Sequence, residues 1–370
     1  MSHIDWHFPR PELAKNYLDK LFHSGIDRIA FFGRRRIGKS EFMMKDLIPS
    51  AEKRGVVAIY CSMWENKDKP YLALLNALRT LAKPEKEGKL KLKLKGVLAE
   101  HVEGGIEFER ASKPAPAATE ELQEITRLFQ ALLKANLKKR KKCLIVLDEI
   151  QHLATSARFA TFAATLRTML DMAGDQVKVV FTGSSYADLQ KLFKDTKAPF
   201  YDFADIITFE PMSHDFVHHL ENIYRQITRQ TLPANDLGNV FEQSGRNAHI
   251  TRSLVQRLVL ELSRDVRAGW EKYKEELMGP DGWCQRQWDG LAQSDKIVYR
   301  LIMEGKELFC EQSLERYRTA GFSRGTAQQA LNRLMNRGLI IRISHGNYST
   351  DVPILDEWVK RIRRAGFRAR

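Results

Sequence analysis

The sequence predicts a parallel α/β domain, then an α-helical lid, then a winged helix-turn-helix domain. Strand-like and helix-like segments alternate from the N-terminus to about residue 212. From Ser213 onward, the apolar residues recur only at helical spacing. After residue 282, three short helix-like segments precede two strand-like segments that turn at 345–347. We therefore expect domain ranges of 1–212, 213–282 and 283–370.

Five short apolar runs are the expected strands of the α/β domain. Most are rich in β-branched or aromatic residues, as is typical of strands. They lie at residues 28–33, 56–63, 143–148, 177–182 and 206–210. Helices are expected after the first strand and at residues 71–83, 119–139 and 157–173. Because this alternation produces a parallel sheet, a ligand is expected at the carboxyl ends of the strands.

Residues 83–118 interrupt the alternation and are expected to form an insertion. The string KLKLKLK alternates lysine with leucine, and IEFER alternates apolar residues with acids. Two interpretations remain open for this segment. It is either a β-hairpin with lysines on one face or a partly disordered loop closed by KPAPAA.

Residues 33–40, GRRRIGKS, match the phosphate-loop pattern G-x-x-x-x-G-K-[ST] without a mismatch. Gly33 and Gly38 allow backbone amides to point at phosphate oxygens, at the positive end of the following helix. Lys39 would contact the β- and γ-phosphates, and the Ser40 hydroxyl would bind Mg²⁺. ATP is favoured over GTP because the chain lacks an N-K-x-D string. The rest of the candidate binding segment consists of Arg34, Arg35, Arg36, Ile37 and Glu41.

The string LIVLDE ends the third expected strand and matches the Walker B pattern. Asp148 would hold the metal, while Glu149 would polarise an attacking water and act as a catalytic residue with Lys39. The fourth strand also ends in polar residues, of which Thr182 and Ser184 could reach the γ-phosphate. A simple turn after that strand is the alternative interpretation.

These strings together resemble the AAA+ P-loop ATPases, and more narrowly their STAND-like, archaeal-type branch with a C-terminal winged helix. FPRPEL near the N-terminus resembles a family segment that lies close to the adenine, which implies a cofactor-binding role for Arg10. SGRNAHITRSL, residues 244–254, resembles the family's lid segment, with Ala248 where proline is usual. Arg246 and Arg252 are the candidates for a lid arginine that reaches the γ-phosphate.

The chain departs from the family where an arginine usually follows the fourth strand. Phe203 occupies that position, so a nucleotide-reaching arginine must come from elsewhere, and hydrolysis is expected to be weak or partner-stimulated. Arg158 and Arg167 are candidate substitutes. The triple arginine, Arg34 to Arg36, either contacts a partner or strengthens the local positive field as a solvated surface.

The C-terminal domain has the features of a DNA-binding winged helix. Ser323 is a good N-cap for the third of its short helices, and the chain ends in a basic tail, VKRIRRAGFRAR. Arginine and glutamine on that helix suit base edges and phosphates in a major groove. The nucleic-acid candidates are Arg324, Thr326, Gln328, Gln329, Arg333 and, on the wing, Arg342. Alternatively, this domain binds a protein or packs on the lid.

Composition supports an anionic partner, with double-stranded DNA first. The formal net charge is +14, although such charge can also serve solubility alone. The four cysteines show neither metal-ligand nor disulfide spacing and are expected to be free thiols in the cytoplasm. The N-terminus does not read as a signal peptide, and no apolar run approaches the ~20 residues that cross a bilayer.

Two functions from different classes follow from these observations. The first is an ATP-dependent switch that binds duplex DNA and serves mobile-element, replication or defence processes. The second is a signalling ATPase with slow hydrolysis whose winged helix binds a protein partner. Either could act as a homo-oligomer. A metabolic kinase or GTPase fits less well, because neither needs the lid and the winged helix.

Overall fold

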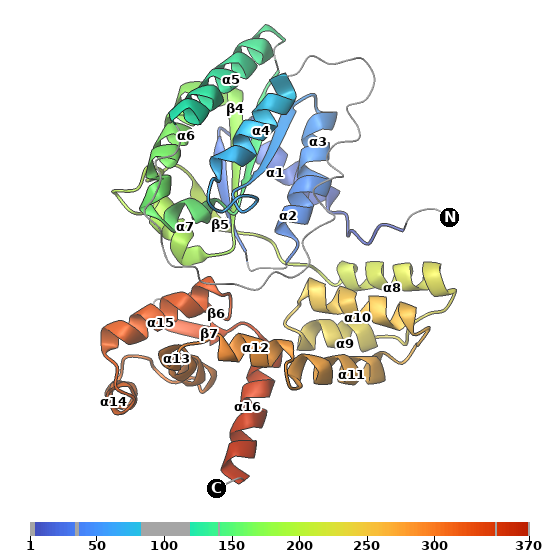
Figure 1. The fold of residues 1–370 in the computed structure, drawn as a ribbon. Coiled ribbons are helices and arrows are strands. Elements are labelled where there is room, and N and C mark those ends of the chain that lie inside the picture. Colours follow the sequence, from blue (N-terminus) through green and yellow to red (C-terminus); the bar gives the residue numbers. More distant parts are fainter. Residues whose placement is uncertain (1–3, 34–36, 83–118, 140, 345, 369–370) are drawn as a thin grey trace.

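The computed structural model describes residues 4–33, 37–82, 119–139, 141–344 and 346–368 (Figure 1). The predicted insertion at 83–118 and the three arginines at 34–36 lie outside these described residues. The strands form one parallel sheet in the order β2-β3-β4-β1-β5. The sequence prediction of five parallel strands is confirmed. Their bounds are β1 (Arg28–Phe32), β2 (Val57–Ser62), β3 (Cys143–Asp148), β4 (Val177–Gly183) and β5 (Asp205–Thr208).

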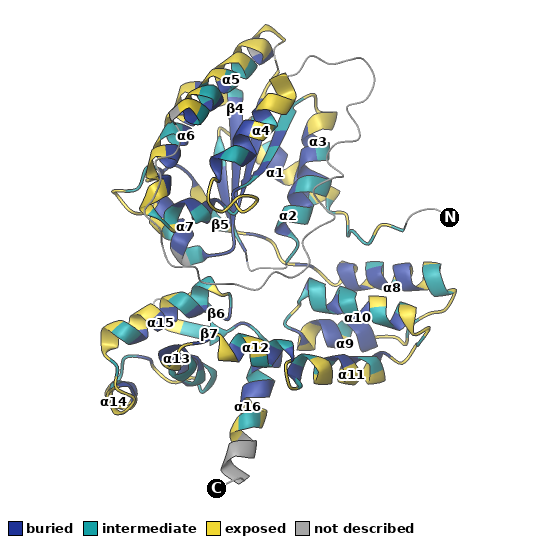
Figure 2. Ribbon diagram, viewed as in Figure 1, coloured by how far each residue is buried: buried dark blue, intermediate teal, exposed yellow. Residues whose placement is uncertain are grey.

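Helices cover both faces of this sheet (Figure 2). Alternate residues of β3 point to opposite faces, so that Ile145 packs on one side and Val146 on the other. One face is covered by α1 (Pro11–His23) and by the helix that follows the phosphate loop. The other face is covered by α4 (Tyr71–Ala82), α5 (Thr119–Lys138), α6 (Ala160–Ala173) and α7 (Tyr186–Phe193).

The helix after the phosphate loop changes pitch along its length. It begins as α2 (Lys39–Phe42), widens into a π-helical turn over Met43–Leu47 and continues as α3 (Ile48–Lys53). Pro49 lacks the amide that an α-helix would require at this position, so the wider turn precedes a residue that cannot propagate the regular ladder. Asp46 lies within this turn and is buried.

A helical region follows the sheet and lies below the carboxyl ends of its strands (Figure 1). The lid consists of α8 (Asp215–Thr228), α9 (Asp236–Gln243), α10 (Ala248–Leu260) and α11 (Val266–Met278). The C-terminal unit consists of α12 (Trp283–Asp289), α13 (Gln293–Met303), α14 (Glu311–Thr319), α15 (Arg324–Asn336), β6 (Ile340–Ser344), β7 (Asn347–Thr350) and α16 (Pro353–Arg368). One apolar cluster extends from Met212 to Val359, so the lid and the C-terminal unit share their packing.

Most of the basic tail belongs to α16, which also carries apolar residues that pack on the rest of the molecule. Leu355 and Val359 are completely buried, and the indole nitrogen of Trp358 donates to the carbonyl of Met278 at 2.8 Å. These apolar positions recur at helical spacing and dock α16 on the lid. The many cations of the segment hide that spacing in the sequence. Ser323 accepts from the amide of Thr326, which confirms it as the N-cap of α15.

Candidate functional site

The two glycines of the phosphate-loop string are favoured for different reasons. A Cβ atom at Gly33 would lie 2.6 Å from Cδ1 of Ile37 and 3.1 Å from Cβ of Phe209, so a side chain there would displace its neighbours. Gly38 has a φ of 86°, in the left-handed region that favours glycine. Lys39 begins α2, is 5% exposed and donates from Nζ to the carbonyl of Gly33 at 2.5 Å. Lys39, at the start of α2, therefore reaches back to Gly33 at the other end of the phosphate-loop string.

Asp148, at the end of β3, accepts hydrogen bonds from three hydroxyl groups. Its Oδ2 lies 2.6 Å from both Ser40 Oγ and Tyr60 OH, and its Oδ1 accepts from Thr182. The carboxylate is 3% exposed, so these donors replace the water that it would bind in the unfolded chain. Ser40 and Asp148 thus present adjacent oxygen atoms, the ligand type that Mg²⁺ prefers, and a metal ion fits this donor set.

Tyr60, on β2, is a member of the site that sequence reasoning missed. Burial, followed by the neighbouring Asp148 carboxylate, raises the pKa of its hydroxyl. The hydroxyl therefore stays protonated and donates to Asp148. A tyrosine within an apolar strand gives no functional signal by itself; only the pairing of β2 with β3 brings the two side chains together.

Glu149 has an unusual backbone conformation next to this carboxylate. Its φ is 55°, in a region that costs energy for residues other than glycine and is frequent at functional sites. Its Oε2 accepts from Gln151 and from Ser184 Oγ, the latter at 2.8 Å. The predicted water-polarising carboxylate is thus held by two neutral side chains beside the metal-ligand candidates.

The polar residues that end β4 have different partners. Thr182 is fully buried on Asp148, whereas Ser184 contacts Glu149. Of the two predicted γ-phosphate sensors, Ser184 therefore lies beside the catalytic candidate and Thr182 supports the metal-ligand candidate. Ser185 Oγ lies 2.7 Å from Oδ1 of Asn336 on α15 and 2.8 Å from Oδ2 of Asp188, so both oxygens compete for its single proton. The contact with Asn336 links the end of β4 to the C-terminal unit.

Arg10 contacts the phosphate-loop string at Gly38. Its guanidinium stacks on the rings of Phe42 and Phe209, with both ring centroids 4.8 Å away, and donates to the carbonyl of Gly38 at 3.4 Å. Burial lowers its pKa. These contacts hold the carbonyl side of the loop, so the predicted cofactor-binding arginine supports the loop from the N-terminal segment.

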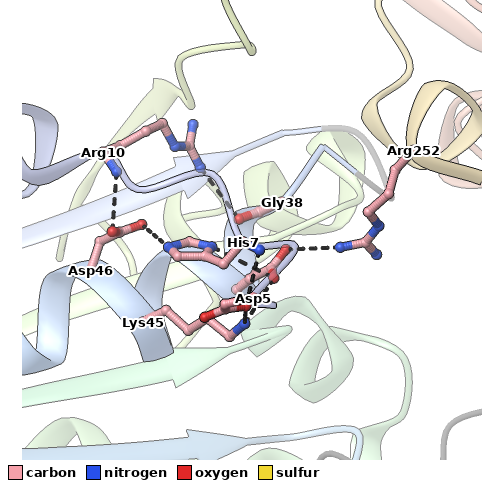
Figure 3. A network of polar contacts seen from close by, with 8 residues as sticks. Asp5, His7, Arg10, Gly38, Lys45, Asp46 and Arg252 are labelled. Atoms are coloured by element: carbon pink, nitrogen blue, oxygen red, sulfur yellow. Dashed lines mark hydrogen bonds and ion pairs between the residues drawn. The ribbon is translucent and has the colours of Figure 1, made fainter. Parts of the chain in front are cut away.

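Glu41, one residue after Ser40, contacts both the N-terminal segment and α10. Figure 3 shows the neighbouring contact between His7 and Asp46. His7 of the N-terminal segment lies 3.5 Å from the Glu41 carboxylate and 3.1 Å from that of Asp46. Arg252 of α10 lies 3.6 Å from the other oxygen of Glu41. Burial disfavours the protonated form of His7, but the two carboxylates outweigh burial and raise its pKa to about 9.

A cavity of about 180 Å³ opens beside Gly38, between the phosphate loop and the lid. Its walls are mostly apolar and aromatic, which suits a flat heteroaromatic ring. The lining includes Trp6, Phe8, Met212, Phe216, Ala248 and Arg252. Arg252 is therefore the lid arginine that the structure places near the loop.

A larger cavity, of about 520 Å³, lies where Ile37 faces the lid and the C-terminal unit. Two of the arginines at its edge already have acidic partners. Arg246 contacts Glu242 at 3.0 Å, and Arg257 contacts Glu276 at 2.6 Å. We assign no ligand to this cavity. Arg246 lines this cavity, whereas Arg252 lines the one beside Gly38, so Arg252 is the stronger candidate for the lid arginine.

The candidate substitutes for the absent arginine are engaged away from the phosphate loop. Phe203 is 4% exposed and lies between the guanidinium groups of Arg28 and Arg167, which are 3.8 and 3.9 Å from its ring centroid. Arg167 also pairs with Asp171. Arg158 pairs with Asp68 at 2.9 Å. Neither Arg158 nor Arg167 is therefore placed to contact a nucleotide in this conformation.

The candidate nucleic-acid residues of α15 fall into two groups. Arg324, Gln328 and Gln329 are exposed, and Thr326 is half-buried. Arg333 instead pairs with the buried carboxylate of Asp295 on α13, at 2.6 Å. Arg333 is therefore partly exposed, and its guanidinium also holds α15 on α13. Arg342 is exposed on β6.

Two other kinds of site are absent from the described part of the chain. Within residues 4–368, apart from the gaps given above, no three His, Cys, Asp or Glu side chains gather as they would to hold a metal ion. Over the same residues, no helix combines the length and apolar character needed to span a bilayer.

Solved structures with the same arrangement identify the fold. The Walker-type ATPase of Pyrococcus abyssi superposes with a TM-score of 0.65 at 15% identity, over 96% of each chain. The chain has the AAA+ ATPase fold. The Aeropyrum pernix ORC2 protein, solved as ADPNP-ADP complexes, matches at 18% identity with a TM-score of 0.54, over 96% of this chain and 93% of that one. No model of a protein family and no curated protein sequence matches this chain.

Proposed function

We propose that the protein is an ATPase that works as a nucleotide-dependent switch and binds duplex DNA through its C-terminal unit. The observation that carries this proposal is the hydrogen bond between Ser185 and Asn336. It joins the strand end that carries Thr182 and Ser184 to the helix that carries the nucleic-acid candidates. A change at the phosphate loop therefore has a short physical route to α15.

Several features support ATP as the ligand. The string GRRRIGKS ends in Lys39 and Ser40 at the start of a helix, and the neighbouring apolar cavity is suited to an adenine ring. The ORC2 protein of similar fold was solved with ADPNP and ADP. In our proposal Lys39 leaves the Gly33 carbonyl to contact phosphate oxygens. Arg252 leaves its ion pair with Glu41 and contacts the nucleotide.

The residues around Asp148 have distinct roles in the proposed hydrolysis. Mg²⁺, when bound, would neutralise charge on the phosphates. Ser40 and Asp148 would hold the metal. Glu149 would orient the attacking water and accept its proton, for which its carboxylate must leave Gln151 and Ser184. While Gln151 and Ser184 bind the Glu149 carboxylate, the base is unavailable and the site is inactive.

The switch follows from the position of Asn336 on α15. Gln329, Asn332 and Asn336 are spaced by three and four residues, so they share one face of the helix. The C-terminal end of that face contacts the ATPase domain at Ser185. A duplex seated along this face would meet the ATPase domain, so DNA binding requires the contact to open. Rearrangement of Ser184, one residue before Ser185, would favour opening.

The direct test measures the DNA affinity of Ser185→Ala and Asn336→Ala by fluorescence anisotropy at several salt concentrations. Without nucleotide, each variant should bind duplex DNA about five- to tenfold more tightly than the parent, because a net interdomain hydrogen bond is worth ~1 kcal/mol. Addition of ATP should reduce the difference in DNA affinity between each variant and the parent. Asn239→Ala, at an exposed position of α9, is the control and should leave binding unchanged.

Two results would overturn this proposal. One is equal DNA affinity in parent and variants with and without ATP. The other is the absence of salt-dependent binding in all of them.

A second candidate is a signalling ATPase whose C-terminal unit binds a protein. It is favoured by the pairing of several C-terminal cations with acids, since Arg316 and Arg363 both contact Glu304. Such pairs reduce the positive potential available to phosphates. A protein that remains bound to the chain after nuclease treatment, while duplex DNA is not retained at low salt, would select this candidate.

A further inference from the structure

Tyr60 occupies a position from which only its hydroxyl reaches the site. It lies on β2, an edge strand of the sheet, and is paired in register with Val146 of β3. Asp148 is two residues further along β3, so its side chain points to the same face as that of Val146. The phenol ring extends from β2 towards the end of β3 and places its oxygen 2.6 Å from Asp148 Oδ2.

The donors around Asp148 leave little freedom to its carboxylate. An ionised carboxylate has about four acceptor positions, and three are taken by the hydroxyls of Ser40, Tyr60 and Thr182. Ser40 and Thr182 bind different oxygens and come from the phosphate-loop helix and from β4. Tyr60 binds the same oxygen as Ser40 from the opposite neighbour, β2. The carboxylate plane is thereby fixed from both sides of β3.

The ring of Tyr60 packs in the apolar core, whereas its hydroxyl forms a hydrogen bond, and the two roles can be separated by mutation. The ring packs against the apolar cluster beneath α1 and the phosphate-loop helix, and a phenylalanine would fill the same space. The hydroxyl has Asp148 as its partner, and packing alone does not require it. The Ser40 hydroxyl also interacts with the Tyr60 oxygen, so removing that oxygen atom alone acts on the two metal-ligand candidates, Asp148 and Ser40.

We propose that Tyr60 is a positioning residue that holds Asp148 in the orientation needed to bind Mg²⁺ together with Ser40. The inference rests on the proposed function, because it concerns the metal of an Mg²⁺–ATP complex. Tyr60 itself touches neither metal nor nucleotide. Its hydroxyl occupies one acceptor position of Oδ2, so that the other position, which the Ser40 hydroxyl now takes, is the one that would face a metal ion shared with Ser40.

The test is Tyr60→Phe, examined by the affinity for ATP in the presence of Mg²⁺ and in the presence of EDTA. Loss of a residue that orients a metal ligand commonly lowers metal affinity by 10- to 100-fold. We therefore expect the Mg²⁺-dependent gain in ATP affinity to fall by about tenfold, and the Mg²⁺ concentration for half-maximal binding to rise accordingly. ATP affinity in EDTA should remain within about twofold of the parent.

Tyr71→Phe provides a matched control. Tyr71 is 4% exposed, lies in the same domain, and donates from its hydroxyl to Glu121 at 2.7 Å, between α4 and α5. Its variant also loses a hydrogen bond from a phenol to a carboxylate, but away from the phosphate loop. Both ATP affinities should be unchanged in this control.

The outcomes separate this inference from the proposed function. If the parent binds ATP with a clear gain from Mg²⁺ and Tyr60→Phe behaves identically, the inference is wrong while ATP binding stands. If Tyr60→Phe weakens binding equally with Mg²⁺ and with EDTA, Tyr60 has a general structural role and the inference is also wrong. If the parent fails to bind ATP in either buffer, both proposals are overturned.

Discussion

At the scale of single residues, the candidate site consists of charged groups held by their own neighbours. Lys39 contacts a carbonyl of its own loop, and Glu149 is bound by Gln151 and Ser184. Each must exchange these partners for ligand atoms if the site is to work. Buried polar groups cost energy when left without partners, so such contacts maintain the loop before a ligand arrives.

His7 provides a pH test of the contact between the N-terminal segment and the phosphate-loop helix. Its pKa is raised to about 9 in the folded chain, against about 6.5 in an unfolded one. Its stabilising effect is therefore complete below pH 6.5 and is lost as the pH rises through 9. His7→Gln should lower the free energy of unfolding by about 1–3 kcal/mol at pH 6 and by much less at pH 9.5.

Denaturant unfolding of the two proteins at both pH values measures this effect. An equal difference between parent and variant at pH 6 and pH 9.5 would show that these carboxylates do not stabilise the protonated form of His7.

At the scale of elements, the strands were well predicted because each is a short apolar run that ends at a polar or glycine residue. β3 was predicted at 143–148 and has these bounds. Two helices, α7 and α16, were harder to predict from the sequence. α7 is only eight residues long, and the cations of α16 obscure the spacing of its buried side chains. Their docking partners, α15 and α11, are distant in the sequence, so local periodicity does not reveal them.

The pairing of α13 with α15 yields a prediction at this scale. Asp295 is 2% exposed and also accepts from the amide of Ala292 at the start of α13. Arg333→Ala would leave this carboxylate without its cation. Because Arg333 itself is 42% exposed, we expect a destabilisation of about 1–3 kcal/mol, below the range for fully buried pairs.

Arg324→Ala is the comparison for this variant, since Arg324 is exposed on the same helix. It should change stability by less than about 0.5 kcal/mol and weaken DNA binding. The reverse pattern, with Arg333→Ala stable and Arg324→Ala unstable, would contradict the roles given to the two arginines. Thermal unfolding and DNA anisotropy provide the two readouts.

At the scale of the whole molecule, contacts over long sequence separations connect the nucleotide site to the C-terminal unit. Ser185 and Asn336 are 151 residues apart. The metal-ligand and base candidates, Asp148 and Glu149, could be predicted from local strings because phosphate chemistry demands particular residue types at fixed spacing. Tyr60 and Ser185 could not, because their roles depend on strand pairing and on domain docking.

The most direct measurement is a calorimetric titration of Mg²⁺–ATP into the parent, Lys39→Ala and Glu149→Gln. The account predicts saturable binding to the parent, binding at least about 100-fold weaker in Lys39→Ala, and binding within about threefold of the parent in Glu149→Gln. Lys39 would lose a charge-assisted phosphate contact, whereas Glu149 would lose only its role in turnover. Unchanged ATP affinity in Lys39→Ala would contradict the account.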